Sequence, residues 1–145
     1  TSGPKEIIEI LRQKSRPYLF SNSLAPSIVG ATLSVLEILK SNKSYINKLQ
    51  QNTKLFRDEI KKIGFEIKPG NHPIIPIMLY DDYLAQKMAN ELLKIGIYVI
   101  GFFYPVVPKG QARIRVQITA AHSNSDIKKA ISAFKKIGKK LKIIK

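Results

Sequence analysis

Two segments of the chain carry side chains that could bind a charged ligand. In the first, residues 101–115, a stretch of aromatic residues and prolines leads to Arg113 and Arg115, which share one face of an expected strand. The fork of N–H donors on a guanidinium binds a carboxylate through two hydrogen bonds, which a lysine does less well. The pattern is therefore compatible with a carboxylate site, and also with two strand arginines that simply face solvent.

The second segment is Phe20-Ser21-Asn22-Ser23, which precedes a helix expected to begin near Pro26. Hydroxyl and amide donors, together with the backbone N–H groups at a helix start, can bind an anion such as a phosphate. An ordinary capped turn has the same composition. The residue types alone leave these two interpretations equal.

Other kinds of site find little support in the sequence. The chain has no cysteine, which excludes disulfides, thiolate nucleophiles and cysteine-based zinc sites. His72 and His122 lie far apart, so no metal site is expected, and each is predicted to have a structural role beside a turn or a helix. Phosphate-binding loops, dinucleotide fingerprints and hydrolase motifs are absent.

The chain is strongly basic, with 25 Lys and Arg against 10 Asp and Glu and a net charge of +15. A lysine-rich background, the attraction of an anionic substrate such as coenzyme A, and nucleic-acid binding would all explain this excess. Nucleic acid is the weakest of the three, because the lysines are scattered and no nucleic-acid motif is visible. No apolar run reaches the ~18–20 residues of a membrane span, and the first residues do not resemble a signal peptide.

The periodicity of apolar residues predicts one α+β domain, with helices packed on a small and mainly antiparallel sheet. Helices are expected at 4–12, 26–40, 43–63 and 83–94, and from a capping box at Ser123–Asp126. Strands are expected at 65–68, 74–79, 97–100 and 112–119. Apolar residues surround most of the 26–40 helix, which predicts that it is buried in a core or a subunit interface.

At residues 15–26 and 101–115, and again at Ala120-Ala121-His122, the chain resembles a known enzyme family. It is similar to the 2-amino-3-ketobutyrate coenzyme A ligases (glycine C-acetyltransferases), a branch of the α-oxoamine synthases. The sister synthases usually have a Thr-Ser pair where Asn22 and Ser23 stand here. The residues of this segment therefore indicate the glycine acetyltransferase branch.

The resemblance implies a fold-type I, aspartate aminotransferase-like enzyme that uses pyridoxal 5'-phosphate (PLP). Residues 1–40 or so would end its large domain, and about 41–145 would form its C-terminal small domain. By this resemblance Ser21 and Asn22 contact the cofactor phosphate of the neighbouring subunit in a homodimer, and Arg115 binds the carboxylate of the amino-acid substrate. The Schiff-base lysine would lie upstream of Thr1, so the chain alone is expected to be inactive.

The activity implied by the resemblance is the condensation of glycine with acetyl-CoA to 2-amino-3-oxobutyrate and CoA, in the cytoplasm, as part of threonine and glycine metabolism. Two alternatives remain open. One is a sister synthase of the 8-amino-7-oxononanoate or 5-aminolevulinate type, and the other is a basic nucleic-acid-binding module.

Overall fold

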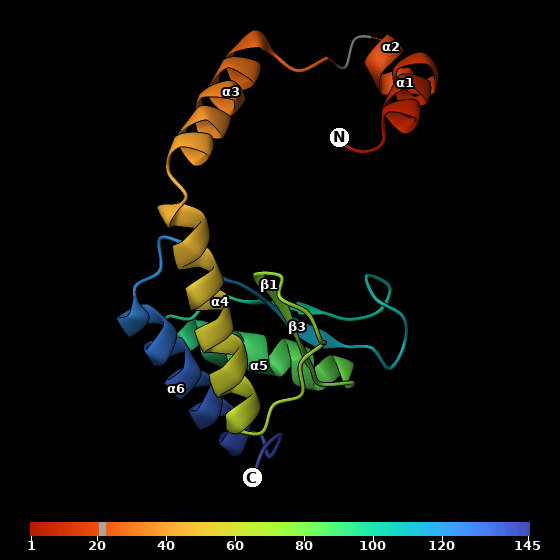
Figure 1. The fold of residues 1–145 in the computed structure, drawn as a ribbon. Coiled ribbons are helices and arrows are strands. Elements are labelled where there is room, and N and C mark those ends of the chain that lie inside the picture. Colours follow the sequence, from red (N-terminus) through yellow and green to blue (C-terminus); the bar gives the residue numbers. More distant parts are fainter. Residues whose placement is uncertain (21–22) are drawn as a thin grey trace. The chain divides into compact units, whose positions relative to one another are not determined.

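The computed structural model describes residues 1–20 and 23–145, and the chain divides into two compact units, Thr1–Asn42 and Lys43–Lys145. Figure 1 labels the six helices of the described residues and the strands β1 (Ile74–Met78) and β3 (Arg113–Gln117). The first unit is helical, and the second combines helices with a β-sheet. The expected α+β fold class is confirmed, and the second unit is the one that positions Arg115.

The first unit contains α1 (Lys5–Lys14), α2 (Arg16–Leu19) and α3 (Pro26–Ser41). The extended backbone of Ser15 separates α1 from α2. Pro17 lies in the first turn of the short helix α2, where a proline loses no hydrogen bond because the first N–H groups of a helix have no intrahelical partner.

Helix α3 departs from the expectation drawn from its composition. Its apolar side chains predicted a buried helix, but none of its residues is buried. Six of its large apolar side chains are between 40% and 57% exposed: Ile28, Val29, Leu33, Val35, Leu36 and Ile38. An apolar circumference makes burial favourable but does not supply the surface that would cover the helix. The described residues of this chain do not bury α3, and its burial in a subunit interface stays a prediction.

The second unit is built on a three-stranded antiparallel sheet with the strand order β1-β3-β2. The strands are β1 (Ile74–Met78), β2 (Ile100–Phe102) and β3 (Arg113–Gln117), and the helices are α4 (Ser44–Lys62), α5 (Asp82–Lys94) and α6 (Asn124–Lys140). Figure 1 shows α4 and α6 side by side, and residues of the two helices are in contact. In the strand order β1-β3-β2, the strand β3 lies in the centre of the sheet.

One hydrophobic core joins the three helices to the sheet. Phe134 of α6 contacts Phe56 of α4 and Phe65 edge to face, with ring centroids 6.0 and 5.9 Å apart, an arrangement that aromatic pairs prefer. Other fully buried side chains come from β1, α5 and β3: Ile75, Ile77, Met88, Leu92 and Ile114. This core covers one face of the sheet and leaves the other face open.

The expected strand at 65–68 is reduced to an isolated bridge between Ile67 and Ile77. The carbonyl of Pro76 accepts a hydrogen bond from the Lys68 N–H at 3.1 Å, so the backbone polar side of Pro76 faces this segment and not β3. A proline lacks the N–H that a strand neighbour needs. Because the missing N–H of Pro76 is on the side of residues 65–68 and not on the side of β3, β1 still pairs with β3 along its whole length.

The strand expected at 97–100 lies further along the chain, as β2. A Cβ atom on Gly101 would stand only 3.0 Å from the carbonyl oxygen of Ala85 in α5, which is tighter than most real Cβ contacts. Glycine thus lets β2 pack directly against α5. Gly101 is the middle residue of the paired segment 100–102.

The start of α6 follows the expectation in detail. The Ser123 hydroxyl accepts a hydrogen bond from the Asp126 N–H at 3.1 Å, and the Asp126 carboxylate accepts one from the Ser123 N–H at 2.9 Å. The Ser123 hydroxyl also donates to the Asp126 carboxylate at 2.7 Å, and this bond, together with the one from the Ser123 N–H, lowers the pKa of Asp126. The predicted capping box is confirmed.

Candidate functional site

The side chains of β3 alternate between the core and the open face of the sheet. Ile114 and Val116 are buried, whereas Arg115 and Gln117 are exposed and Arg113 is half-buried. The predicted alternation is therefore confirmed. Both arginines project from the open face because a strand directs successive side chains to opposite sides.

Arg115 lies in the middle of this open face. It stands opposite Pro76 of β1 on one side and Ile100 of β2 on the other. Within residues 1–20 and 23–145, no carboxylate forms an ion pair with Arg113 or Arg115. The guanidinium of Arg115 therefore keeps its donors for a ligand, and a carboxylate is the group that fits its fork.

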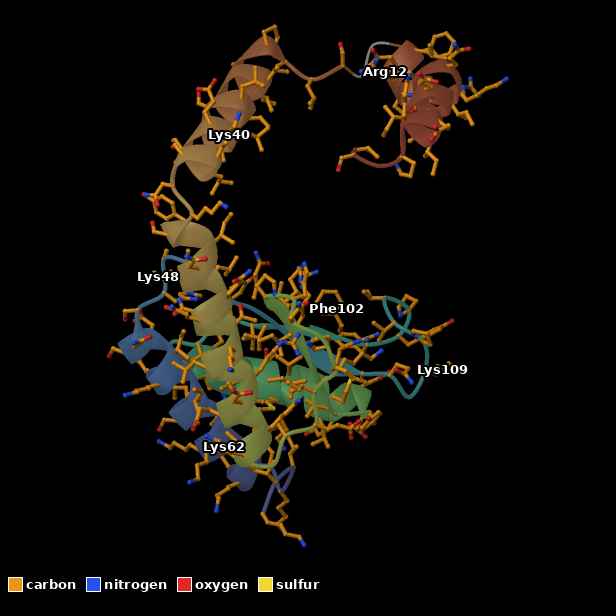
Figure 2. All side chains as sticks on the ribbon, viewed as in Figure 1. Arg12, Lys40, Lys48, Lys62, Phe102 and Lys109 are labelled. Atoms are coloured by element: carbon orange, nitrogen blue, oxygen red, sulfur yellow. The ribbon has the colours of Figure 1, made fainter. Side chains whose placement is uncertain are left out.

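The ring of Phe102 lies next to the Arg115 guanidinium, with the Arg115 Cζ atom 4.7 Å from the ring centroid. Phe102 stands on β2 directly opposite Arg113, and it is labelled in Figure 2. Arg115 is thus its diagonal neighbour across the two strands, a separation that an aromatic side chain can bridge. Sequence reasoning noted the aromatic run but did not predict which aromatic residue meets which arginine.

Arg115 also lines a pocket of about 540 Å³ in the second unit. Segment 96–100, the end of β3 and the first turns of α6 form its walls. Its apolar lining includes Phe56, Ile127 and Phe134, and its polar lining includes His122 and Lys129. The apolar wall belongs to the hydrophobic core, whereas the Arg115 side chain projects from the open face, so the pocket lies beside the central strand and is not formed by the open face alone.

Buried Asn52 of α4 fixes the chain just beyond β3. Its amide nitrogen donates to the carbonyl oxygens of Thr119 and His122 at 3.1 and 2.9 Å, and the residue is only 2% exposed. The His122 Nδ1 accepts a hydrogen bond from the Thr119 N–H at 3.2 Å. His122 therefore has the structural role that was predicted for it.

Arg57 of α4 holds the loop that leads into β1. Its guanidinium donates to the carbonyl oxygens of Lys68 and His72, and burial lowers its pKa from the ordinary value. His72 in turn accepts from the Ile74 N–H through Nδ1, at 3.1 Å. Asn52 and Arg57 were not predicted from the sequence. The available signal was their spacing of about one helical turn from Phe56 and Ile60, which places them beside the core-facing stripe of α4.

The predicted phosphate-binding residues Ser21 and Asn22 lie outside the described residues. Helix α3, which follows them, has Ala25 at its N-cap, no side-chain cap among the described residues and no acidic residue in its first turn. Such a helix start presents backbone N–H groups and the positive end of the helix dipole to an anion. These features of the helix start fit an anionic group such as the phosphate of PLP, and the contribution of Ser21 and Asn22 stays a prediction.

The fold of the chain matches the C-terminal part of solved PLP-dependent transferases. Serine palmitoyltransferase from S. paucimobilis, solved with a bound PLP–myriocin aldimine, has this fold, with a TM-score of 0.86 and 28% identity over 99% of this chain and 36% of that chain. Residues 1–134 match the family model of aminotransferase class I and II. The chain belongs to this family.

Two relatives indicate the branch of the family. The 2-amino-3-ketobutyrate coenzyme A ligase of Escherichia coli K12 is 54% identical over 144 residues, which are 99% of this chain and 36% of that protein. The 8-amino-7-oxononanoate synthase of Thermosipho melanesiensis is 43% identical over 143 residues, 99% of this chain and 37% of that protein. The chain thus spans little more than a third of the length of these relatives, and the expected resemblance is confirmed.

Among the described residues, no helix combines the length and the apolar character needed to cross a bilayer.

Proposed function

We propose that the chain is the C-terminal part of a PLP-dependent acyltransferase that condenses glycine with acetyl-CoA to 2-amino-3-oxobutyrate and CoA. The observation that carries this proposal is the guanidinium of Arg115 on the open face of the central strand, which forms an ion pair with no carboxylate of the described residues. The higher identity to the ligase than to the synthase supports this choice of branch.

In the proposed reaction, PLP supplies an electron sink for the negative charge that develops on the substrate α-carbon. Arg115 binds the glycine carboxylate through two hydrogen bonds and so orients the bond that loses its proton. The substrate α-carbon would form a bond to the thioester carbonyl carbon of acetyl-CoA while the C–S bond breaks, and the proton lost from the α-carbon would balance the one that CoA gains as the thiol. The net charge of +15 favours the approach of the anionic CoA, an effect that salt weakens.

The remaining roles follow from the same proposal. Ser21 and Asn22 bind the PLP phosphate of the neighbouring subunit, so that the enzyme is a homodimer with shared sites. The enzyme is located in the cytoplasm. Residues 1 to about 40 end the large domain, and about 41 to 145 form the small domain. The 145-residue chain is inactive alone, because the lysine that binds PLP belongs to the preceding part of the enzyme.

The test uses the complete enzyme and compares Arg115→Ala with Arg113→Ala. Each charge-assisted hydrogen bond contributes about 1.5–3 kcal/mol, so loss of the pair should raise the glycine KM by roughly two orders of magnitude or more. The Arg113 variant should change the glycine KM far less, with both variants folded by circular dichroism. An unchanged glycine KM in Arg115→Ala would remove the role of Arg115.

The same preparation separates the alternatives. A panel of amino acids and acyl-CoA thioesters distinguishes glycine acetyltransferase from a sister synthase, which the 43% identity to 8-amino-7-oxononanoate synthase keeps open. A gel-shift titration with RNA at increasing salt examines the basic binding module suggested by the net charge of +15. Turnover of glycine and acetyl-CoA, with no gel shift near physiological salt, is the expected result.

A further inference from the structure

The open face of the sheet contains a contact that the proposed function does not require by itself. Phe102 faces two arginines, Arg113 directly opposite and Arg115 on the diagonal. Its ring contacts the guanidinium of Arg115, at 4.7 Å from the ring centroid to Cζ. The aromatic ring thus accompanies the arginine that stands in the centre of the sheet and lines the pocket.

This contact leaves the arginine free to bind a ligand. A cation–π contact uses the electron density of the ring face and takes up no N–H donor. No carboxylate of the described residues pairs with Arg115 either. The contact therefore restricts the motion of a long side chain while its hydrogen-bonding fork stays available, which lowers the entropy lost when a substrate binds.

The backbone holds Phe102 in this position. Gly101 pairs with Ile114 and packs against α5, where a Cβ atom would approach the Ala85 carbonyl to 3.0 Å. This close approach fixes β2 against both its helix and β3. Phe102 pairs with Arg113, and paired residues of neighbouring strands point to the same face of the sheet. Phe102 therefore lies on the same face as Arg113 and Arg115.

We propose that Phe102 is a positioning residue for Arg115: its ring supports the guanidinium so that the N–H fork is presented to the substrate carboxylate. The proposal rests on the proposed function, since it assigns Phe102 a role in binding glycine through Arg115. It predicts that removal of the ring weakens glycine binding without altering the chemical step.

The first experiment measures the kinetics of the complete enzyme with Phe102→Leu and Phe102→Tyr. Loss of a cation–π contact should raise the glycine KM roughly three- to tenfold in Phe102→Leu, with little change in kcat, and Phe102→Tyr should restore it. Tyr83→Leu is the matched control, because Tyr83 is 66% exposed and lies 5.2 Å from the Lys87 ammonium on α5. That variant should leave the glycine KM unchanged.

A double-mutant cycle tests whether Phe102 acts through Arg115. In an Arg115→Ala background, Phe102→Leu should have no further effect on kcat/KM for glycine, since the side chain that it supports is gone. An equal loss in both backgrounds would overturn the proposal, and so would an unchanged glycine KM in Phe102→Leu alone.

A spectroscopic measurement on the 145-residue chain examines the contact without any turnover. The side-chain proton resonances of Arg115 should be shifted upfield by the ring current in the wild type and in Phe102→Tyr, and should return toward ordinary values in Phe102→Leu. Unshifted resonances in the wild type would overturn the positioning role even if the enzyme uses glycine. A complete enzyme that does not turn over glycine would instead refute the proposed function, and the positioning role with it.

Discussion

Replacement of Asn52 by alanine tests how the second unit holds the end of its central strand. The Asn52 amide is the buried donor to two carbonyl oxygens, those of Thr119 and His122, at 3.1 and 2.9 Å. These partners follow β3 and precede α6, so one side chain of α4 joins both elements. Asn52→Ala removes both hydrogen bonds and leaves the backbone sequence of the joined segment unchanged.

The expected magnitude combines two opposing effects. Two hydrogen bonds contribute about 1 kcal/mol each, and a carbonyl left without a partner in a buried place adds about 1–3 kcal/mol. Thr119 and His122 are half-buried, so water can reach part of the vacated space and limit this second contribution. Alanine favours the helix by about 0.6 kcal/mol over asparagine, which leaves an expected loss of about 2 kcal/mol.

The assay is thermal unfolding of the 145-residue chain, followed by circular dichroism. A loss of about 2 kcal/mol should lower the Tm by roughly 10 °C for a folded unit of this size. Asn47→Ala is the matched control, because Asn47 is an exposed asparagine of the same helix, and it should be neutral or slightly stabilising. If Asn52→Ala lowers the Tm no more than Asn47→Ala, the bridging role is refuted.

Two further predictions concern other contacts of the second unit. Hydrogen bonds from Lys140 and from Lys94 lower the pKa of Glu91 to about 2, so the stabilisation from this group should be present above its ordinary pKa of 4.5 and lost as the pH falls toward 2. The Tm difference between wild type and Glu91→Gln should shrink over this range, and a constant difference would contradict the assignment. Gly101→Ala should destabilise the chain by about 1–3 kcal/mol in urea unfolding, because the new methyl group meets the Ala85 carbonyl. An unchanged urea midpoint would show that β2 can move away from α5.

Local patterns in the sequence were sufficient for several features. The alternation of residues 113–117 predicted that Arg115 would face away from the core, because the side-chain period of a strand is two. The Ser123 and Asp126 pair predicted the start of α6, since both partners of a capping box lie within one turn. Helices α4 and α5 also began and ended close to the expected residues.

Other features depended on contacts between distant segments. The apolar composition of α3 indicated burial, but composition does not specify a partner surface. Residues 65–68 alternate like a strand yet form a single bridge. The roles of Ser21 and Asn22 stay predictions drawn from the resemblance to the α-oxoamine synthases.

The sequence by itself determined that an arginine suited to a carboxylate would stand on an exposed strand face, because its residue type and its place in the alternation are local properties. Only the tertiary structure decided what surrounds that arginine. Phe102 reaches Arg115 through the register of β2 on β3, and Asn52 reaches Thr119 across 67 residues of chain. These contacts depend on how helices and strands pack together, which the local pattern of residues does not specify.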